Sequence, residues 1–225
     1  MSVNKEMYLI QGLPQETYEE FSERVLEVAK SLPDKEDDLS VKLVYTKSAP
    51  PKLSIIPFKK KKIAAISVYK AKETPKTELS TIDGLIGMYS VEEAIPVAYK
   101  KEWNDMEHTP GVCLFTIFKK KKDISHASFL DRWHNSHTPL SLKIHPLWNY
   151  NRNVVLDQLN EISANWDGIV EEQFKTKSDL LNPVNFFGHP FIMPYRMWQV
   201  YSDTRSFLEY KTIEPYFAVE QILKS

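Results

Sequence analysis

The alternation of apolar and polar positions divides the first half of the chain into strands and helices. Residues 15–32 carry apolar side chains at helical spacing, which predicts an amphipathic helix. Residues 91–103 are predicted to form a second helix. Short apolar runs predict strands at residues 8–10, 41–45, 63–69 and 82–89, and residues 53–56 are expected to pair with the third of these as a hairpin.

The second half repeats this order of elements. Residues 112–118 form a run of β-branched and aromatic side chains, which predicts a strand. Ser125 can cap a helix over residues 126–138, and Pro139 should end it, because the residue before a proline disfavours the helical conformation. Further on we predict strands at residues 150–156, 169–174 and 216–223, helices at 177–181 and 204–210, and irregular structure at 182–194.

Two short sequence matches support an internal duplication. Residues 21–24 (FSER) align with 129–132 (FLDR) at an offset of 108, and residues 83–86 (DGLI) align with 167–170 (DGIV) at an offset of 84. The proline-bounded hairpin in the first half has about the length that explains the change of offset. We therefore predict a repeat over residues 1–108, with an inserted hairpin, and a second repeat over residues 109–225.

Composition is typical of a globular protein rather than a disordered chain. The 225 residues are 42% hydrophobic, and 29 basic side chains oppose 30 acidic ones. Neither half carries a basic field, so no nucleic-acid partner is expected. No apolar run approaches the ~20 residues of a membrane helix, and the first residues lack the apolar core of a signal peptide. We expect no membrane partner and a cytoplasmic location, in which the single Cys113 is a small buried hydrophobe.

Several common cofactor and hydrolase motifs are missing from the sequence. The six glycines form neither GxGxxG nor GxxxxGK[ST], and HExxH and GxSxG do not occur. His134 and His137 are three residues apart, but no carboxylate completes an obvious metal-binding set. We therefore expect no cofactor and no metal.

The histidines point to one half of the chain. All six fall between residues 108 and 189, so at most one of two related halves keeps a histidine-based site. Phe129, Trp133 and His137 follow one another at intervals of four, which places His137 on the inward face of its helix. An inward imidazole can exchange protons near neutral pH, although a core histidine bonded to a backbone carbonyl is the alternative.

The segment at residues 118–140 carries a family resemblance. A basic turn (KKKK) follows the strand, the next helix has Phe129 and Trp133 four apart, and His137 precedes Pro139-Leu140. This pattern resembles the EthD family, which belongs to the dimeric α/β-barrel superfamily of ferredoxin-like units. Later matches are Pro146 with Tyr150, Asp167-Gly168, and residues 203–209 (DTRSFLE), in which Thr204 stands where glutamate is usual.

The resemblance covers residues 111–225, and the first half looks like a degenerate copy. Val25, Ala29 and Ser31 stand at its positions for Trp, His and Pro. The resemblance implies an α+β fold of two tandem ferredoxin-like repeats, whose antiparallel sheets form an internal α/β barrel with the helices outside. It also implies one histidine pocket in that barrel. Any homodimer is expected to join two completed barrels through their outer surfaces.

The family's relatives imply a cofactor-independent small-molecule enzyme of the lyase, cyclase, isomerase or monooxygenase type. His137 would transfer the proton and Tyr150 would donate a hydrogen bond to a developing oxyanion. The substrate would be a hydrophobic, oxygen-bearing small molecule. The expected pocket residues are Phe129, Trp133, Trp148, His145 at the mouth, and His189 in an aromatic lid. Alternatively, Tyr150 and Trp148 only fill the core, and His189 only packs within its loop.

Two other functions remain open at this stage. The chain could be a non-catalytic small-ligand-binding or accessory protein of a degradation pathway, since it lacks cofactor motifs and one half has lost the site. It could also bind haem through His137 or His145, as other barrel relatives do.

Overall fold

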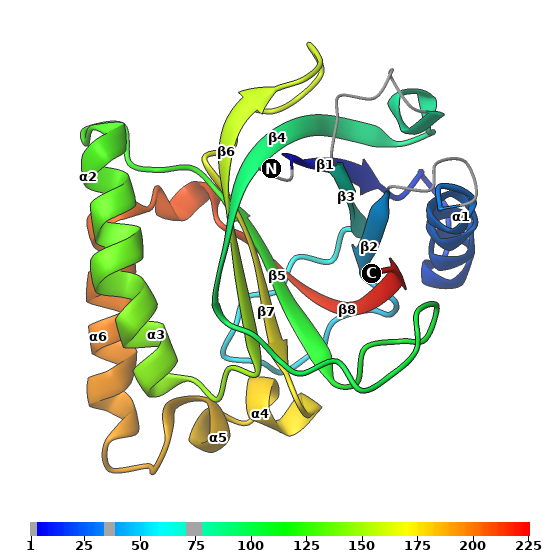
Figure 1. Cartoon of the computed structure of the whole chain (residues 1–225). Coiled ribbons are helices and arrows are strands. Elements are labelled where there is room, and N and C mark those ends of the chain that lie inside the picture. Colours follow the sequence, from blue (N-terminus) through cyan, green and yellow to red (C-terminus); the bar gives the residue numbers. More distant parts are fainter. Residues whose placement is uncertain (1–3, 34–38, 71–77) are drawn as a thin grey trace.

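Eight antiparallel strands close into a barrel in the computed structural model, which describes residues 4–33, 39–70 and 78–225 (Figure 1). Around the barrel the strands follow the order β1-β3-β2-β8-β5-β7-β6-β4. Their bounds are β1 Asn4–Gln11, β2 Ser40–Tyr45, β3 Ile63–Lys70, β4 Leu85–Val97, β5 Val112–Phe118, β6 Asn149–Gln158, β7 Gly168–Phe174 and β8 Glu214–Lys224.

The longer helices lie outside the barrel on two opposite sides of it, and the short α4 and α5 lie at its lower end in this view (Figure 1). Helix α1 covers the strands of the first half, whereas α2, α3 and α6 cover those of the second half. No helix in the described part of the chain is long and apolar enough to cross a membrane. The helices are α1 Tyr18–Ser31, α2 His126–Asp131, α3 Thr138–Ile144, α4 Lys177–Leu181, α5 Pro183–Phe187 and α6 Met193–Phe207, with a π-helical stretch at Arg132–His137 and 3-10 turns at Glu78–Thr81 and Tyr210–Thr212.

Each half of the chain contributes four neighbouring strands to the barrel. Numbered within its own half, each set follows the order 4-1-3-2, which is that of a ferredoxin-like unit. Two seams then join the sets, β2 with β8 and β4 with β6. The expected α+β fold with an internal antiparallel barrel is confirmed. The division into repeats at residues 1–108 and 109–225 stays a prediction.

Alternation along the strands gives every strand a face toward the barrel interior and a face toward a helix layer. On β5, Cys113 and Phe115 point into the barrel, whereas Leu114 and Phe118 point outward. Cys113 is fully buried, as expected. One end of the barrel interior is an apolar core formed by Met7, Leu9, Val44, Ile63, Ala65, Tyr89, Val91, Cys113, Phe115, Ile117, Ile169, Tyr216 and Ala218.

The helix predicted to end before Pro139 continues to Ile144. The Thr138 N–H bonds the Trp133 carbonyl five residues back, and the Thr138 hydroxyl donates to the same carbonyl at 2.9 Å. This π-helical turn inserts one extra residue ahead of Pro139. Pro139 then lies in the first turn of α3, where a missing N–H leaves no helical bond unmade.

Four other predictions were wrong. Residues 91–97 belong to β4 rather than to a helix, because β4 pairs with β1 and then with β6, and this pairing outweighs the helical spacing. Residues 53–56 form a loop instead of a strand. Helix α6 begins at Met193 instead of residue 204, and α5 forms within the segment predicted to be irregular, capped by the Asn182 side chain.

Separating the halves should expose both seams. A fragment of residues 109–225 leaves β8 without β2 and β6 without β4, and it uncovers the inward face of the second sheet. We expect this fragment to aggregate or to pair with itself, because unpaired strand edges recruit other chains. Size-exclusion chromatography with light scattering checks this, with the full chain as the control. A soluble and stable monomeric fragment would contradict the expectation.

Candidate active site

A cavity of about 380 Å³ lies between the outward face of the second sheet and helices α3 and α6. Most of its wall is apolar, including Leu114, Phe118, Val170 and Phe207. We expected the histidine pocket inside the barrel, but these residues lie on the opposite side of the sheet from the barrel core. The volume falls within the range of small-molecule sites.

His137 lines this cavity and forms hydrogen bonds through both ring nitrogens. Its Nδ1 lies 2.8 Å from Oδ2 of Asp203, and its Nε2 lies 3.1 Å from Oγ of Ser141. A carboxylate only accepts, so Nδ1 carries the proton and Nε2 accepts from the Ser141 hydroxyl. The ring also packs against Phe207, with 5.4 Å between centroids. The hydrogen-bond partners of His137 are therefore side chains. The alternative hypothesis of a core histidine bonded to a backbone carbonyl does not fit this geometry.

Asp203 of α6 is held in place by two side chains of the π-helical stretch between α2 and α3. It accepts from Ser136 Oγ at 2.6 Å as well as from His137. Burial favours its neutral form, but the hydrogen bonds from His137 and Ser136 lower the pKa of Asp203. The carboxylate is thus charged at neutral pH and can stabilise an imidazolium at His137.

Tyr150 of β6 is fully buried at the base of the cavity. Its hydroxyl oxygen accepts from Trp133 Nε1 at 3.3 Å, and the Thr138 side chain is a second hydrogen-bonding partner. Burial and the nearby carboxyl of Glu172 raise the pKa of Tyr150. The phenol therefore stays protonated and serves as a hydrogen-bond donor.

Glu172 of β7 is a second titratable group in the cavity wall, and the sequence analysis missed it. It contacts the cavity, while the surrounding protein removes it from bulk water, and this burial raises the pKa of Glu172 to about 7. The signal was present in the sequence: Glu171 and Glu172 are consecutive in a strand, so the two carboxyls must point to opposite faces.

His145 is buried in the cavity wall. Its Nδ1 donates to the Phe186 carbonyl at 3.0 Å, and its ring stacks on Phe186 with 4.0 Å between centroids. Burial lowers the pKa of His145 to about 4, so the imidazole is neutral and its Nε2 is an acceptor.

The other predicted site residues fall in three places. Trp133 lines the cavity, and Phe129 packs behind it with 5.3 Å between centroids. Trp148 instead stacks with Tyr99 and Trp103, and His189 is exposed and stacks on Phe191. Hence His137, Tyr150, Trp133 and His145 come together, whereas Trp148 and His189 do not line this cavity.

The first half of the chain closes part of the cavity. Residues 55–57, in the loop predicted to be a strand, form part of the wall. The loop is fixed by the Lys59 N–H, which donates to the Pro215 carbonyl at 2.8 Å, and by the edge-to-face contact of Phe58 with Phe217. The site thus depends on both halves.

No group of three His, Cys, Asp or Glu side chains suited to a metal occurs among residues 4–33, 39–70 and 78–225. The groups gathered in the cavity are instead a histidine–aspartate pair, a serine hydroxyl, a phenol and a carboxyl. In a largely apolar cavity, this set can move a proton and stabilise a negative oxygen.

The fold and site define an α+β barrel with a histidine-containing apolar cavity beside its second sheet. The EthD domain family model matches residues 121–194, a segment that includes Trp133, His137, Tyr150 and Glu172. The EthD resemblance of the second half is therefore confirmed over this segment.

Two solved structures are similar to the whole chain. An anthrone oxidase-like protein aligns with a TM-score of 0.61 at 11% identity, covering 99% of this chain and 92% of its own. A candidate monooxygenase from Fusobacterium nucleatum subsp. nucleatum aligns with a TM-score of 0.53 at 12% identity, covering 99% and 93%. No curated protein matches the sequence. At these identities the two structures establish the fold alone.

The raised pKa of Glu172 predicts a pH-dependent stability. Folded Glu172 holds its proton up to about pH 7, whereas the ordinary carboxyl value of 4.5 applies to the unfolded chain. The free energy of unfolding should therefore fall as pH rises from about 4.5 through 7, by up to about 3 kcal/mol at ~1.4 kcal/mol per pKa unit. In Glu172→Gln, the free energy of unfolding measured with urea should not show this decrease between pH 5 and pH 8.

The matched control is Glu102→Gln, because the Glu102 side chain is 73% exposed. This variant should keep the pH dependence of the unchanged chain. An identical pH dependence in Glu172→Gln and Glu102→Gln would show that Glu172 titrates like an ordinary surface carboxyl.

Proposed function

We propose that this chain is an enzyme that transfers a proton to and from a hydrophobic, oxygen-bearing small molecule, with His137 as the proton-transfer residue. The observation that carries the proposal is the position of His137, whose Nδ1 bonds Asp203 while its Nε2 and Ser141 line an apolar cavity. A base oriented by a carboxylate is the usual arrangement in acid–base catalysis, and here the carboxylate is the partly buried Asp203.

The proton path follows from the hydrogen bonds. Nε2 of His137 accepts a proton from the substrate, either directly or through the Ser141 hydroxyl, which passes its own proton to Nε2 as it takes one up. The resulting imidazolium is stabilised by Asp203. Electrons from the broken C–H or O–H bond move onto a substrate oxygen, to which Tyr150 donates a hydrogen bond.

Glu172 gives the same cavity a second proton-transfer group. With a pKa of about 7, its carboxyl is present in both protonation states near neutral pH. It can therefore return a proton at a second position of the substrate, as an isomerase, lyase or cyclase requires. In a monooxygenase reaction the first proton transfer would form an anion that adds dioxygen. The protonated peroxide would then lose its second C–H proton to a base while the O–O bond breaks, which gives a carbonyl group and releases the outer oxygen as water.

The names of the two similar structures suggest a compound with which the proposed reaction can be tested. One is called anthrone oxidase-like and the other a candidate monooxygenase. Anthrone is a flat hydrophobic ketone whose methylene protons are acidic, because their removal gives an aromatic oxyanion. This chemistry matches the apolar wall, the His137 base and the Tyr150 donor, so we propose that the substrate is of this class.

Neither of the two alternative functions is supported by a contact as specific as that between His137 and Asp203. Haem ligation by His137 would displace the Ser141 hydroxyl from Nε2, and haem ligation by the Nε2 of His145 stays a prediction. A pure binding protein would need no oriented base, although the same cavity could hold a ligand. The isotope experiment below separates binding from chemistry.

Replacing His137 should abolish proton exchange in the cavity. We expect the unchanged chain to speed the uptake of deuterium by anthrone from D₂O without oxygen, as followed by mass spectrometry. His137→Gln should lose most of this rate, on the order of 10²-fold or more, since it removes the base. His189→Gln is the matched control, because His189 is exposed and outside the cavity.

Equal exchange rates in His137→Gln and the unchanged chain would contradict the assignment of the base. Saturable anthrone binding without any accelerated exchange would favour the non-catalytic binding protein instead. Melting curves of both variants show whether a loss of rate reflects unfolding.

Removing the phenol of Tyr150 should slow the same reaction while leaving the base in place. Tyr150→Phe deletes the donor to the developing oxyanion, and a lost donor of this kind slows a reaction roughly 100-fold. The deuterium exchange rate should therefore fall while anthrone binding changes little. An unchanged exchange rate would show that Tyr150 only fills the core.

A further inference from the structure

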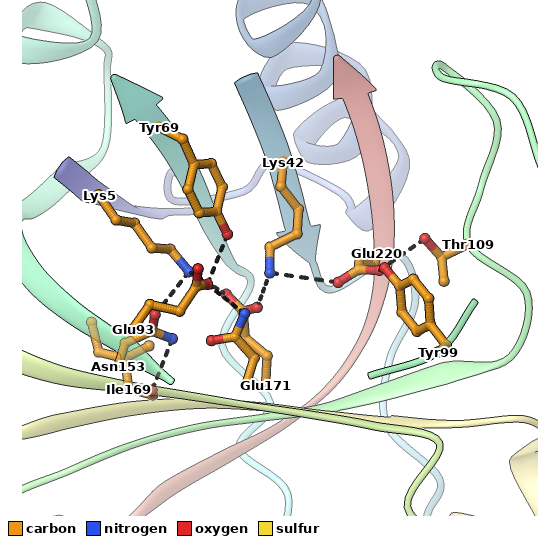
Figure 2. A network of polar contacts seen from close by, with 11 residues as sticks. Lys5, Lys42, Tyr69, Glu93, Tyr99, Thr109, Asn153, Ile169, Glu171 and Glu220 are labelled. Atoms are coloured by element: carbon orange, nitrogen blue, oxygen red, sulfur yellow. Dashed lines mark hydrogen bonds and ion pairs between the residues drawn. The ribbon is translucent and has the colours of Figure 1, made fainter. Parts of the chain in front are cut away.

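The buried lysines inside the barrel are paired with carboxylates. Lys5 of β1 and Lys42 of β2 point inward and are nearly buried (Figure 2). Lys5 Nζ lies 2.7 Å from a carboxylate oxygen of Glu93, and Lys42 Nζ bonds a carboxylate oxygen of Glu171. Pairing of this kind offsets much of the cost of removing a charge from water. Both lysines thus have the partner that a buried cation needs.

Arg152 of β6 is a buried cation without such a partner. Only 8% of its surface is exposed, yet no carboxylate of the described residues forms an ion pair with it. Its Nε is buried and has no hydrogen-bond partner in the same part of the chain. Burial lowers the pKa of Arg152, which reflects the cost of holding its charge away from water. A neutral side chain could join the same elements at lower cost, so the charge itself calls for a role.

Arg152 and Tyr150 lie on the same, outward face of β6. Asn153 points inward and accepts from Lys5 at 2.8 Å (Figure 2), so the alternation along the strand turns residues 150 and 152 outward. Across the ladder, Tyr150 is paired with Glu172 of β7. Burial and the charge of Glu172 raise the pKa of Tyr150, whereas the charge of Arg152 lowers it. The guanidinium is therefore close enough to favour negative charge at the phenol.

Thr138 connects the guanidinium to the phenol. Arg152 Nη1 donates to Thr138 Oγ1 at 2.6 Å, and the Thr138 side chain is also a hydrogen-bonding partner of Tyr150. The Thr138 hydroxyl donates to the Trp133 carbonyl, but that carbonyl also accepts from the Thr138 N–H. A rotation about the Cβ–Oγ bond therefore lets the hydroxyl donate to Tyr150 without leaving the carbonyl unpartnered. The donors then point one way, from Arg152 through Thr138 and Tyr150 into the cavity.

We infer that the His137 cavity binds its oxygen-bearing ligand as an anion, an enolate or a phenolate, and that Arg152 stabilises this anion through Thr138 and Tyr150. Arg152 does not line the cavity, so it is a positioning residue that does not touch the ligand. Hydrogen bonds in a chain polarise one another, so a phenol bonded to a chain that begins at a cation is a stronger donor to a negative oxygen. The inference rests on the function proposed above, since it names the source of positive charge for the anion formed there.

The ionisation of bound 4-nitrophenol tests this inference. The anion of this small aromatic acid absorbs visible light and the neutral form does not, so absorbance gives the ionised fraction of the bound probe. At about pH 6, where Glu172 with its pKa of about 7 is mostly protonated, the full chain should bind the probe saturably. It should also hold more of the probe as phenolate than free solution does. Arg152→Gln should lower the bound ratio of phenolate to phenol at least about tenfold, which is one pKa unit.

A conservative variant separates the charge of Arg152 from its packing. Arg152→Lys keeps the positive charge but loses the guanidinium fork, so it should restore most of the bound phenolate. Thr138→Val removes the connecting hydroxyl at similar size, so it should lower the phenolate fraction although Arg152 remains. If melting curves show that Arg152→Gln does not fold, Thr138→Val provides the test in its place.

Lys143→Gln is the matched control. It removes a positive charge from α3, the helix that begins at Thr138, but Lys143 is exposed and outside the cavity. This variant should leave the phenolate fraction unchanged. Equal phenolate fractions in Arg152→Gln and the unchanged chain would overturn the inference, and so would equal losses in Arg152→Lys and Arg152→Gln. A bound probe that stays neutral in the unchanged chain would overturn it as well.

The same comparison in a His137→Gln background separates this inference from the proposed function. The ionisation of a bound probe is an equilibrium that needs no catalytic base, so Arg152→Gln should lower the phenolate fraction there too. If His137→Gln loses deuterium exchange but Arg152→Gln leaves the probe unchanged, the inference is wrong and the assignment of the base stands. If Arg152→Gln lowers the phenolate fraction but His137→Gln keeps its exchange rate, the anion site stands and the base is wrong.

Discussion

The two seams that close the barrel fix the position of everything else in this protein. Each half provides four strands with two open edges, and the pairing of β2 with β8 and of β4 with β6 satisfies all of them. Closure removes the strand edges that would otherwise bind other chains. It also buries the inward faces, which fill with side chains. The apolar cavity beside His137 lies outside the barrel, between the second sheet and its helices.

The position of His137 depends on a local departure from helical geometry. The π-helical stretch between α2 and α3 lets the helix pass through Pro139 without an unmade bond and ends at His137 itself. The helix thereby presents Trp133 to the core, while His137 and Ser141 face the cavity together. Such insertions are frequent at functional sites, because they rotate the following residues relative to a regular helix.

Local patterns in the sequence were sufficient for most strands and for the inward face of the histidine helix. Strand β5 follows its predicted bounds, and Phe129 and Trp133, which lie four residues apart, are both buried as their spacing predicted. Two of the wrong predictions, for β4 and α6, have different physical causes. The end of β4 is defined by its distant partner β6, and α6 exposes large side chains such as Trp198, so its apolar stripe is weak.

The candidate site was harder to predict because its contacts join distant parts of the chain. His137 and Asp203 are 66 residues apart, and the loop at residues 55–57 comes from the other half. The periodicity of apolar residues does not indicate contacts between residues so far apart in the sequence. The resemblance to the EthD family supplied the histidine helix but also led us to include Trp148, which the structure places in an aromatic cluster with Tyr99 and Trp103.

Strand β7 shows how one wall can separate two chemical environments. Its consecutive residues Glu171 and Glu172 point to opposite faces, and their surroundings give them opposite properties. Glu171 meets Lys42 inside the barrel and belongs to an ionic cluster. Glu172 faces a largely apolar cavity, and burial raises its pKa to about 7. A two-residue period in one strand therefore suffices to place a charged acceptor on one side and a proton-exchanging group on the other.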